Sequence, residues 1–222
     1  MNEIITTYAL ENHPFFKEST FHTPHHLWAM LLTGRSFKED LFLKHMPALI
    51  LHIRHHPIIA SIMISQLNDE MGDGDYVNKG HLNLYEPLFE SASRWRHEGA
   101  HEHVQTITQQ LLIDMSNGLG EPEENVYRCL GAYVGTEIAA GAIIDLIGKL
   151  TRKHIDGNGG LEWVEAHDEV EHEHTAGVLK IVDHLPDDPE IRKTYWQGAK
   201  DMLVALRRYF SSLQEIEFAI AV

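Results

Sequence analysis

The sequence has one cysteine, few basic residues and no long hydrophobic run, and each scarcity excludes a class of protein. Cys129 is the single cysteine, so no disulfide can form within the chain. Because no run of about 18 consecutive apolar residues occurs, we expect no transmembrane helix and no membrane partner. The 18 Lys and Arg residues are outnumbered by 33 Asp and Glu, and the formal charge is −15. Without a basic patch, we also expect no nucleic-acid partner.

Runs of β-branched residues separated by hairpin turns are missing too, whereas apolar residues recur with helical period along almost the whole chain. The sequence therefore predicts an all-α protein. Its 222 residues suffice for a substantial core, and no repeat, linker or low-complexity tract divides them. We expect a single helical domain over residues 1–222. No secretory signal is recognisable at Met1–Glu11, so a cytoplasmic protein is expected.

Prolines, glycines and capping residues set the expected helix boundaries. Thr23-Pro24 is typical of a helix start, and Ser36 and Glu39 have the spacing of a capping box. Gly157-Asn-Gly-Gly160 is the strongest break in the chain. The expected helices cover Glu3–Asn12, residues 24–33 and 36–52, Ile58–Met71, Lys79–His97, Ala100–Met115, residues 121–154, Leu161–His184 and Glu190–Phe218.

The expected helix Leu161–His184 carries ionisable residues on the face that should be buried. His167, Glu171 and His174 have the spacing i, i+4 and i+7, which places them on one stripe together with apolar residues. Burying such groups without partners is costly, and two imidazoles with a carboxylate are a ligand set for a divalent transition metal. The alternative is a solvated acidic helix face, but the more polar residues of this helix lie off the stripe.

Two further segments place carboxylates and a histidine where metal ligands are expected. Glu137 lies on the apolar side of the longest expected helix, so its carboxylate should be buried. Small residues beside it, among them Gly135 and Ala140, would let another backbone or a ligand come close. Glu70 ends one helix and His81 begins the next, so the two can converge on one site. The structural alternatives are a Glu137 carboxylate that accepts a hydrogen bond from a core Tyr or Ser, a surface Glu70 and a capping His81.

Together these residues resemble the ligand pattern of the heme-oxygenase-like di-iron oxidases and oxygenases, a superfamily that also includes the TenA, PqqC and chlamydial CADD types. The resemblance covers about Ile58 to His184. It is carried by Leu67-Asn-Asp-Glu70-Met-Gly, His81-Leu-Asn-Leu, the mid-helix Glu137 and His167-x3-Glu171-x2-His174. It implies a heme-oxygenase-like bundle of about seven core helices, usually a homodimer, with a di-iron site that activates O2.

Carried over residue by residue, the resemblance implies that the metal ligands are Glu70, His81, Glu137, His167, Glu171 and His174. Mixed nitrogen and oxygen ligands with open positions suit iron and O2 activation. The cofactor would be two Fe(II)/Fe(III) ions, which manganese could replace. Glu70, Glu137 and His167 would act in catalysis through the metals. The partners would be O2 and a small metabolite such as an amino acid, a fatty acid or a similar organic acid.

Two features depart from the family pattern. Ten residues separate Glu70 from His81, where the family often has six, and this difference implies an enlarged loop. Glu90 and His97 do have six residues between them and are the alternative first pair. Glu171 stands where several members have Asp, a shorter side chain of the same charge.

Other functions are compatible with parts of the sequence. His97-Glu-Gly-Ala-His101 matches the H-E-x-x-H zinc-protease pattern, although Gly99 weakens the helix there. Cys129 lies two turns before Glu137, where TenA-type thiaminases, which need no metal, carry their nucleophile. A non-enzymatic metal-binding or interaction protein could use the same bundle as a scaffold. A heme-binding oxygenase could take an axial ligand from His22, His25 or His26.

The function expected from the sequence is a non-heme di-iron oxidase or oxygenase that acts on a small organic acid. Tyr133 is expected to tune the site from beside the ligands. Arg207 and Arg208 could bind a substrate carboxylate, but surface arginines are the simpler interpretation.

Overall fold

The computed structural model describes residues 2–72, 80–119, 122–156 and 160–218, and within these ranges it contains helices and no strand. The expected all-α class is confirmed. The helices are α1 (Asn2–Tyr8), α2 (Pro14–Lys17), α3 (Pro24–Asp40), a π-helix (Leu41–His45), α4 (Met46–Ile53), α5 (Pro57–Met71), α6 (Gly80–Ala92), α7 (Glu98–Leu119), α8 (Pro122–His154), α9 (Leu161–Lys180) and α10 (Pro189–Gln214), with 3-10 turns at Leu10–Asn12, Ser19–Phe21, Ser93–Trp95 and Ile181–His184.

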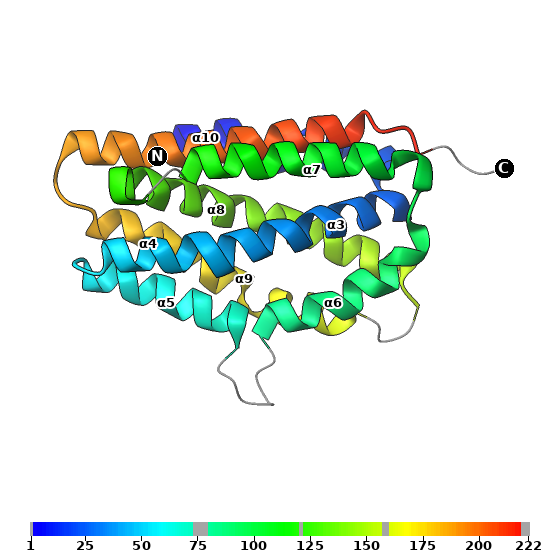
Figure 1. Ribbon diagram of the computed structural model, residues 1–222, viewed down its shortest axis with the longest axis horizontal. Helices are drawn as coiled ribbons and strands as arrows, with labels where there is room; N and C mark the ends of the chain where they lie inside the picture. The colour runs from blue at the N-terminus through cyan, green and yellow to red at the C-terminus, as the bar shows by residue number, and fades with distance from the viewer. Residues whose placement is uncertain (1, 73–79, 120–121, 157–159, 219–222) are drawn as a thin grey trace.

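Helix α8 is the central element of the bundle. It contacts α3, α4, α7, α9 and α10. In Figure 1, α7 and α10 lie along one long side of the molecule, and α5 and α6 lie along the opposite side. Helix α8 is long and apolar enough to cross a membrane, but 67% of its most apolar window is buried inside the bundle, as in the core helix of a soluble protein. The metal ligands expected on α5, α6, α8 and α9 therefore surround one region of the core.

The contact between α8 and α10 brings the two backbones together. A Cβ atom added at Gly131 would lie 1.8 Å from the carbonyl oxygen of Tyr195, and one added at Gly198 would lie 2.0 Å from the carbonyl oxygen of Arg128. No side chain fits in these gaps, so the glycines are required by packing. The expectation that Gly135 lets another backbone come close is also confirmed, because a Cβ there would lie 2.6 Å from the carbonyl oxygen of Ala199 in α10.

The expected break between residues 33 and 36 does not exist. Helix α3 continues through Gly34 to Asp40 and passes without interruption into the π-helix and then α4, so Ser36 caps nothing. A Cβ at Gly34 would lie 2.4 Å from the hydroxyl of Tyr85, which donates a hydrogen bond to the Leu31 carbonyl oxygen at 2.8 Å. The glycine makes room for this tyrosine and does not end the helix, which could be seen only with α6 in place.

Several expected helix ends are also shifted. Helix α6 stops at Ala92 and is followed by a 3-10 turn, well short of His97. Helix α10 stops at Gln214, and α9 passes into a 3-10 turn after Lys180. The expected start at Thr23-Pro24 is found, because the Thr23 hydroxyl accepts a hydrogen bond from the His26 amide at 3.4 Å.

The ring of His26 is buried among aromatic side chains at the start of α3. It is 5% exposed, and its centroid lies 5.5 Å from that of Phe15 and 4.7 Å from that of Phe218. Burial, together with the charges of the neighbouring His22 and His25, lowers the pKa of His26 to about 4. The imidazole is therefore neutral in the folded protein at every pH above this value.

This buried histidine makes folding stability depend on pH. Below pH ~6.5 the unfolded chain protonates His26 while the folded chain does not, so stability falls as the pH decreases. Between pH 7 and pH 5, the free energy of unfolding should fall by about 2 kcal/mol more in the wild type than in His26→Phe. Urea unfolding of the metal-free protein at both pH values measures this difference. Equal losses in the two proteins would show that His26 does not resist protonation.

Candidate metal centre

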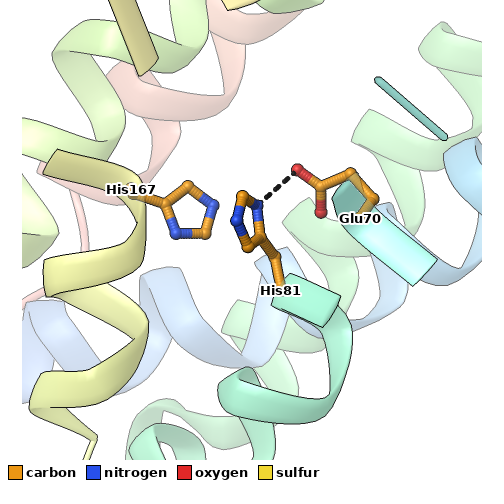
Figure 2. A group of neighbouring side chains, drawn as sticks. All are labelled: Glu70, His81 and His167. Carbon is orange, nitrogen blue, oxygen red and sulfur yellow. Dashed lines mark hydrogen bonds and ion pairs between the residues drawn. The ribbon is translucent and has the colours of Figure 1, made fainter. Parts of the chain in front are cut away.

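Glu70, His81 and His167 meet at the junction of α5, α6 and α9. Their potential ligand atoms all lie within 4.8 Å of one another, and each residue is less than 9% exposed. The Nδ1 atom of His81 lies 3.3 Å from Oε1 of Glu70, and the ring centroids of His81 and His167 are 4.2 Å apart. Figure 2 shows the His81 ring between the carboxylate on one side and the His167 ring on the other.

Two glycines bring Glu70 and His81 together. Glu70 is the penultimate residue of α5, and His81 is the second residue of α6. Gly72 ends α5 with a φ of 77°, and Gly80 opens α6 with a φ of 60°, a conformation that glycine adopts without strain. A Cβ at Gly80 would lie 2.4 Å from the Met71 carbonyl carbon, so the two helix ends touch. Most of the enlarged loop between them, residues 73–79, lies outside the described residues.

The alternative pair, Glu90 and His97, is not part of this cluster. Glu90 is exposed on α6. The His97 ring lies 5.5 Å from that of His25 and 5.8 Å from that of Phe218, beyond the end of α6. The six-residue spacing of this pair therefore does not bring it to the site.

The environment of His167 holds it in the neutral form that binds metals. Burial lowers the pKa of His167 well below its usual range, and the nearby charge of Lys38 lowers it further. Nδ1 of His167 donates a hydrogen bond to the Trp163 carbonyl oxygen at 2.8 Å. A carbonyl can only accept, so the proton is on Nδ1 and the lone pair on Nε2 is available to a metal.

Glu70 is ionised although it is buried. Burial by itself raises the pKa of this carboxyl, but the charge of Lys38 and the hydrogen bond from His81 outweigh that effect and lower it to about 2. Oε2 of Glu70 accepts no hydrogen bond within the described structure, and the nearest cation, Nζ of Lys38, is 3.7 Å away. A buried carboxylate oxygen without a donor is well suited to a metal ion.

His174 lies beside the cluster on the same helix face as His167. Its ring centroid is 6.0 Å from that of His81, and its Nε2 donates to Oδ2 of Asp69 at 3.1 Å. The side-chain amide nitrogen of Gln66 donates a hydrogen bond to the backbone carbonyl oxygen of His174 at 3.2 Å. Asp69 therefore fixes the tautomer that leaves the lone pair on Nδ1. Sequence reasoning missed Asp69 and Gln66, although both are close in sequence to Glu70 and on the same helix.

Glu137 reaches the same region from α8. It is 7% exposed and lines one cavity together with Glu70, His167 and His174. The Tyr133 hydroxyl donates to Oε1 of Gln66 and lies within hydrogen-bonding range of Glu137. Burial raises the pKa of Tyr133 far above its usual range, and the charges of Glu137 and Glu70 raise it further, so the hydroxyl keeps its proton. Tyr133 thus stands beside the expected ligands, where the sequence placed it.

The sixth expected ligand, Glu171, lies in α9. Its side chain is outside the described part of the structure. Its position one turn after His167 and one turn before His174 puts it on their helix face. Five of the six expected ligands thus lie on one side of the core, and three of these five already have the close spacing of metal ligands.

The H-E-x-x-H pattern does not form a second metal site among the described residues. It lies at the first turn of α7, where the side chain of Glu98 is 78% exposed and pairs with Arg96. The His101 ring packs 5.8 Å from that of Trp28. Within the described part of the chain, the cluster of Glu70, His81 and His167 is the sole group with ligand spacing.

Arg207 and Arg208 are not placed to anchor a substrate at this centre. Nη1 of Arg207 donates to the Ala9 carbonyl oxygen at 2.9 Å. Both arginines line a separate groove between α7 and α10. The structure supports the simpler expectation of surface arginines, since Arg208 is exposed and Arg207 is half-buried.

Metal binding should depend on His167 and not on His101. His167→Ala removes the Nε2 atom that would bind the metal, and it should weaken Mn(II) binding by at least about 100-fold. Loss of a metal ligand costs at least as much affinity as loss of a residue that supports a ligand. His101→Ala should change the affinity by less than about twofold. Isothermal titration calorimetry with metal-free protein measures both. If the two variants behave in the opposite way, the zinc-protease pattern is the metal site.

Comparisons with known proteins identify the fold and the family of the chain. No curated protein matches the sequence. Two solved structures of a CADD-like protein of unknown function from Nostoc punctiforme PCC 73102 share the fold. One has 18% identity, a TM-score of 0.66 and coverage of 96% of this chain and 97% of the other; the second has 14% identity, a TM-score of 0.62 and coverage of 98% of both. The model of the iron-containing redox enzyme family matches residues 32–207. With most of its length matched and a buried Glu/His cluster at its centre, the chain belongs to the iron-containing redox enzyme family.

Proposed function

We propose that the protein is a non-heme di-iron enzyme that uses O2 to oxidise or oxygenate a small organic acid. The observation that carries this proposal is that Glu70 and His167 belong both to the buried ligand cluster and to the wall of a cavity. A metal held by them would face any molecule in that cavity. Membership of the iron-containing redox family supports iron as the metal.

The proposed ligands are the six residues expected from the sequence: Glu70, His81, Glu137, His167, Glu171 and His174. Three carboxylates and three imidazoles are more donors than one ion needs, which favours two ions. Bound iron would supply the electrons that reduce O2. Manganese fits the same donors and could replace iron.

The chain's own residues prepare this site in three ways. The Trp163 carbonyl and Asp69 orient His167 and His174, so that their lone pairs are available without rearrangement. Tyr133 offers a proton donor next to Glu137 and Gln66. The apolar wall of the cavity excludes bulk water from the substrate side and thereby protects a reactive centre from solvent.

We further propose that the enzyme acts in the cytoplasm as a homodimer.

Iron stoichiometry and reaction with O2 test the proposal. Protein loaded without oxygen should bind close to two Fe(II) per chain, because the donor set exceeds the needs of one ion. Mixing with O2 should produce an absorbance change in stopped-flow measurements that Glu137→Ala abolishes. A wild-type stoichiometry of one or zero, or an unchanged trace in Glu137→Ala, would contradict the di-iron assignment.

Cys129 distinguishes this enzyme from a TenA-type thiaminase. Cys129 is 2% exposed and is not among the residues lining the cavity. Cys129→Ser should therefore keep the O2 reaction rate within a few-fold, since the change affects packing and removes no reacting group. A rate loss of orders of magnitude, accompanied by hydrolysis of thiamin analogues in the wild type, would instead identify Cys129 as a nucleophile.

A further inference from the structure

The cavity beside the metal centre is lined mostly by apolar side chains. It has a volume of about 120 Å³. Glu70, Glu137, His167 and His174 contribute to its wall, and Lys38 is the sole Lys or Arg among the described residues that line it. The remainder of the wall is mostly aliphatic and aromatic, with residues such as Phe37, Leu41, Ile143, Ile144, Ile147 and Phe210.

The ammonium group of Lys38 is buried and poorly compensated. Its Nζ atom is inaccessible to solvent and donates no hydrogen bond to any described residue, although an ammonium has three donors. It lies 3.7 Å from Oε2 of Glu70, and 4.8 Å and 5.2 Å from the ring centroids of Trp163 and Tyr85. Cation–π contacts offset only part of the cost of removing an ammonium from water. Lys38 can therefore accept a further anionic partner.

The helix that carries Lys38 changes geometry beside the cavity. Two residues after Lys38, α3 ends and the π-helix Leu41–His45 begins. Leu41 and Phe42, from the first turn of the π-helix, line the same cavity. Because π-helical turns occur frequently at functional sites, this local irregularity is consistent with a ligand site at Lys38.

A bound metal would engage Glu70, whose carboxylate is the one ion-pair partner of Lys38 among the described residues. A divalent cation bound to Glu70 would neutralise the negative charge of this carboxylate. The positive charge of Lys38 would then lose most of the negative charge that balances it. The Lys38 ammonium then needs an anion from elsewhere. The cavity that it lines is the space from which such an anion can come.

We propose that Lys38 anchors the carboxylate of a monocarboxylic acid whose apolar body fills the cavity, and this assignment rests on the proposed function for the identity of the reacting centre. Lys38 is the sole Lys or Arg among the described residues of the cavity wall, so it offers one positive charge and matches one carboxylate better than a dianion such as a phosphate. An amino acid would place its α-ammonium next to Lys38 and the metal, where it would be repelled as well.

The cavity volume limits the apolar body. An apolar protein cavity of about 150 Å³ holds one benzene molecule. The cavity of about 120 Å³ therefore matches a body slightly smaller than that, such as an aliphatic chain of about five carbons. Hexanoate is accordingly the probe acid. Three analogues have a similar chain: hexan-1-ol lacks the carboxylate, hexylamine carries the opposite charge, and norleucine has an added α-ammonium.

Calorimetric titration of the Mn(II)-loaded protein in the absence of O2 tests the anchor. Hexanoate should bind at least tenfold more tightly than any of the three analogues. Lys38→Met, which keeps the length of the side chain, should weaken hexanoate binding at least tenfold and change hexan-1-ol binding by less than twofold. Lys44→Met is the matched control, because Lys44 follows on the same helical run but is exposed and pairs with Asp40.

Reciprocal effects on metal binding provide a second readout. If hexanoate replaces Glu70 as the partner of Lys38, hexanoate should raise the affinity for Mn(II) by the same factor by which Mn(II) raises the affinity for hexanoate. In Lys38→Met this factor should approach one, while Mn(II) alone binds no more weakly than to the wild type. Lys38→Gln serves if Lys38→Met does not fold.

The outcomes separate this inference from the proposed function. Equal hexanoate affinities in wild type and Lys38→Met, or tighter binding of norleucine than of hexanoate, would overturn the anchor even if the iron and O2 results hold. Hexanoate binding that depends on Lys38 would support the anchor even if the protein does not react with O2.

Discussion

An ionised carboxylate buried where three helices meet is the constraint on which the rest of the structure depends. Glu70 is 6% exposed and keeps its charge because Lys38, His81 and His167 surround it. These groups come from α3, α6 and α9, so all three helices must approach the end of α5. Removal of one of these partners would leave an uncompensated buried charge, which costs about 3–5 kcal/mol. The bundle is therefore arranged around this cluster as well as around its apolar core.

The parts of the structure that could be predicted from sequence are those that depend on helical periodicity. The helical class, the buried face of α9 and the convergence of Glu70 and His81 across the helix ends all depend on spacing and on glycines at fixed positions. Glu137 could be placed because a carboxylate on the apolar side of a helix is unusual in any context. The family resemblance then assigned these separate positions to one centre, which periodicity alone could not do.

The features that could not be predicted are set by contacts between distant segments. Gly34 looked like a helix break, but it accommodates the Tyr85 hydroxyl from another helix. Asp69 orients His174 across more than a hundred residues, and nothing in its neighbourhood in sequence indicates this. Lys38 carries no motif at all; its importance follows only from burial and from missing hydrogen bonds. Arg207, a plausible anchor by residue type, faces a different groove.

The direct backbone contact between α8 and α10 at Gly131 and Gly198 affects how the bundle can move. Two backbones in direct contact cannot slide or separate without losing that contact, so this pair is the stiffest unit of the bundle. Helices α5 and α6 lie on the far side of the molecule from α7 and α10 and meet each other only at their ends near the ligands (Figure 1). Strain from a change in coordination would consequently be distributed into α5 and α6, while Glu137 on α8 would keep its position as a fixed reference point.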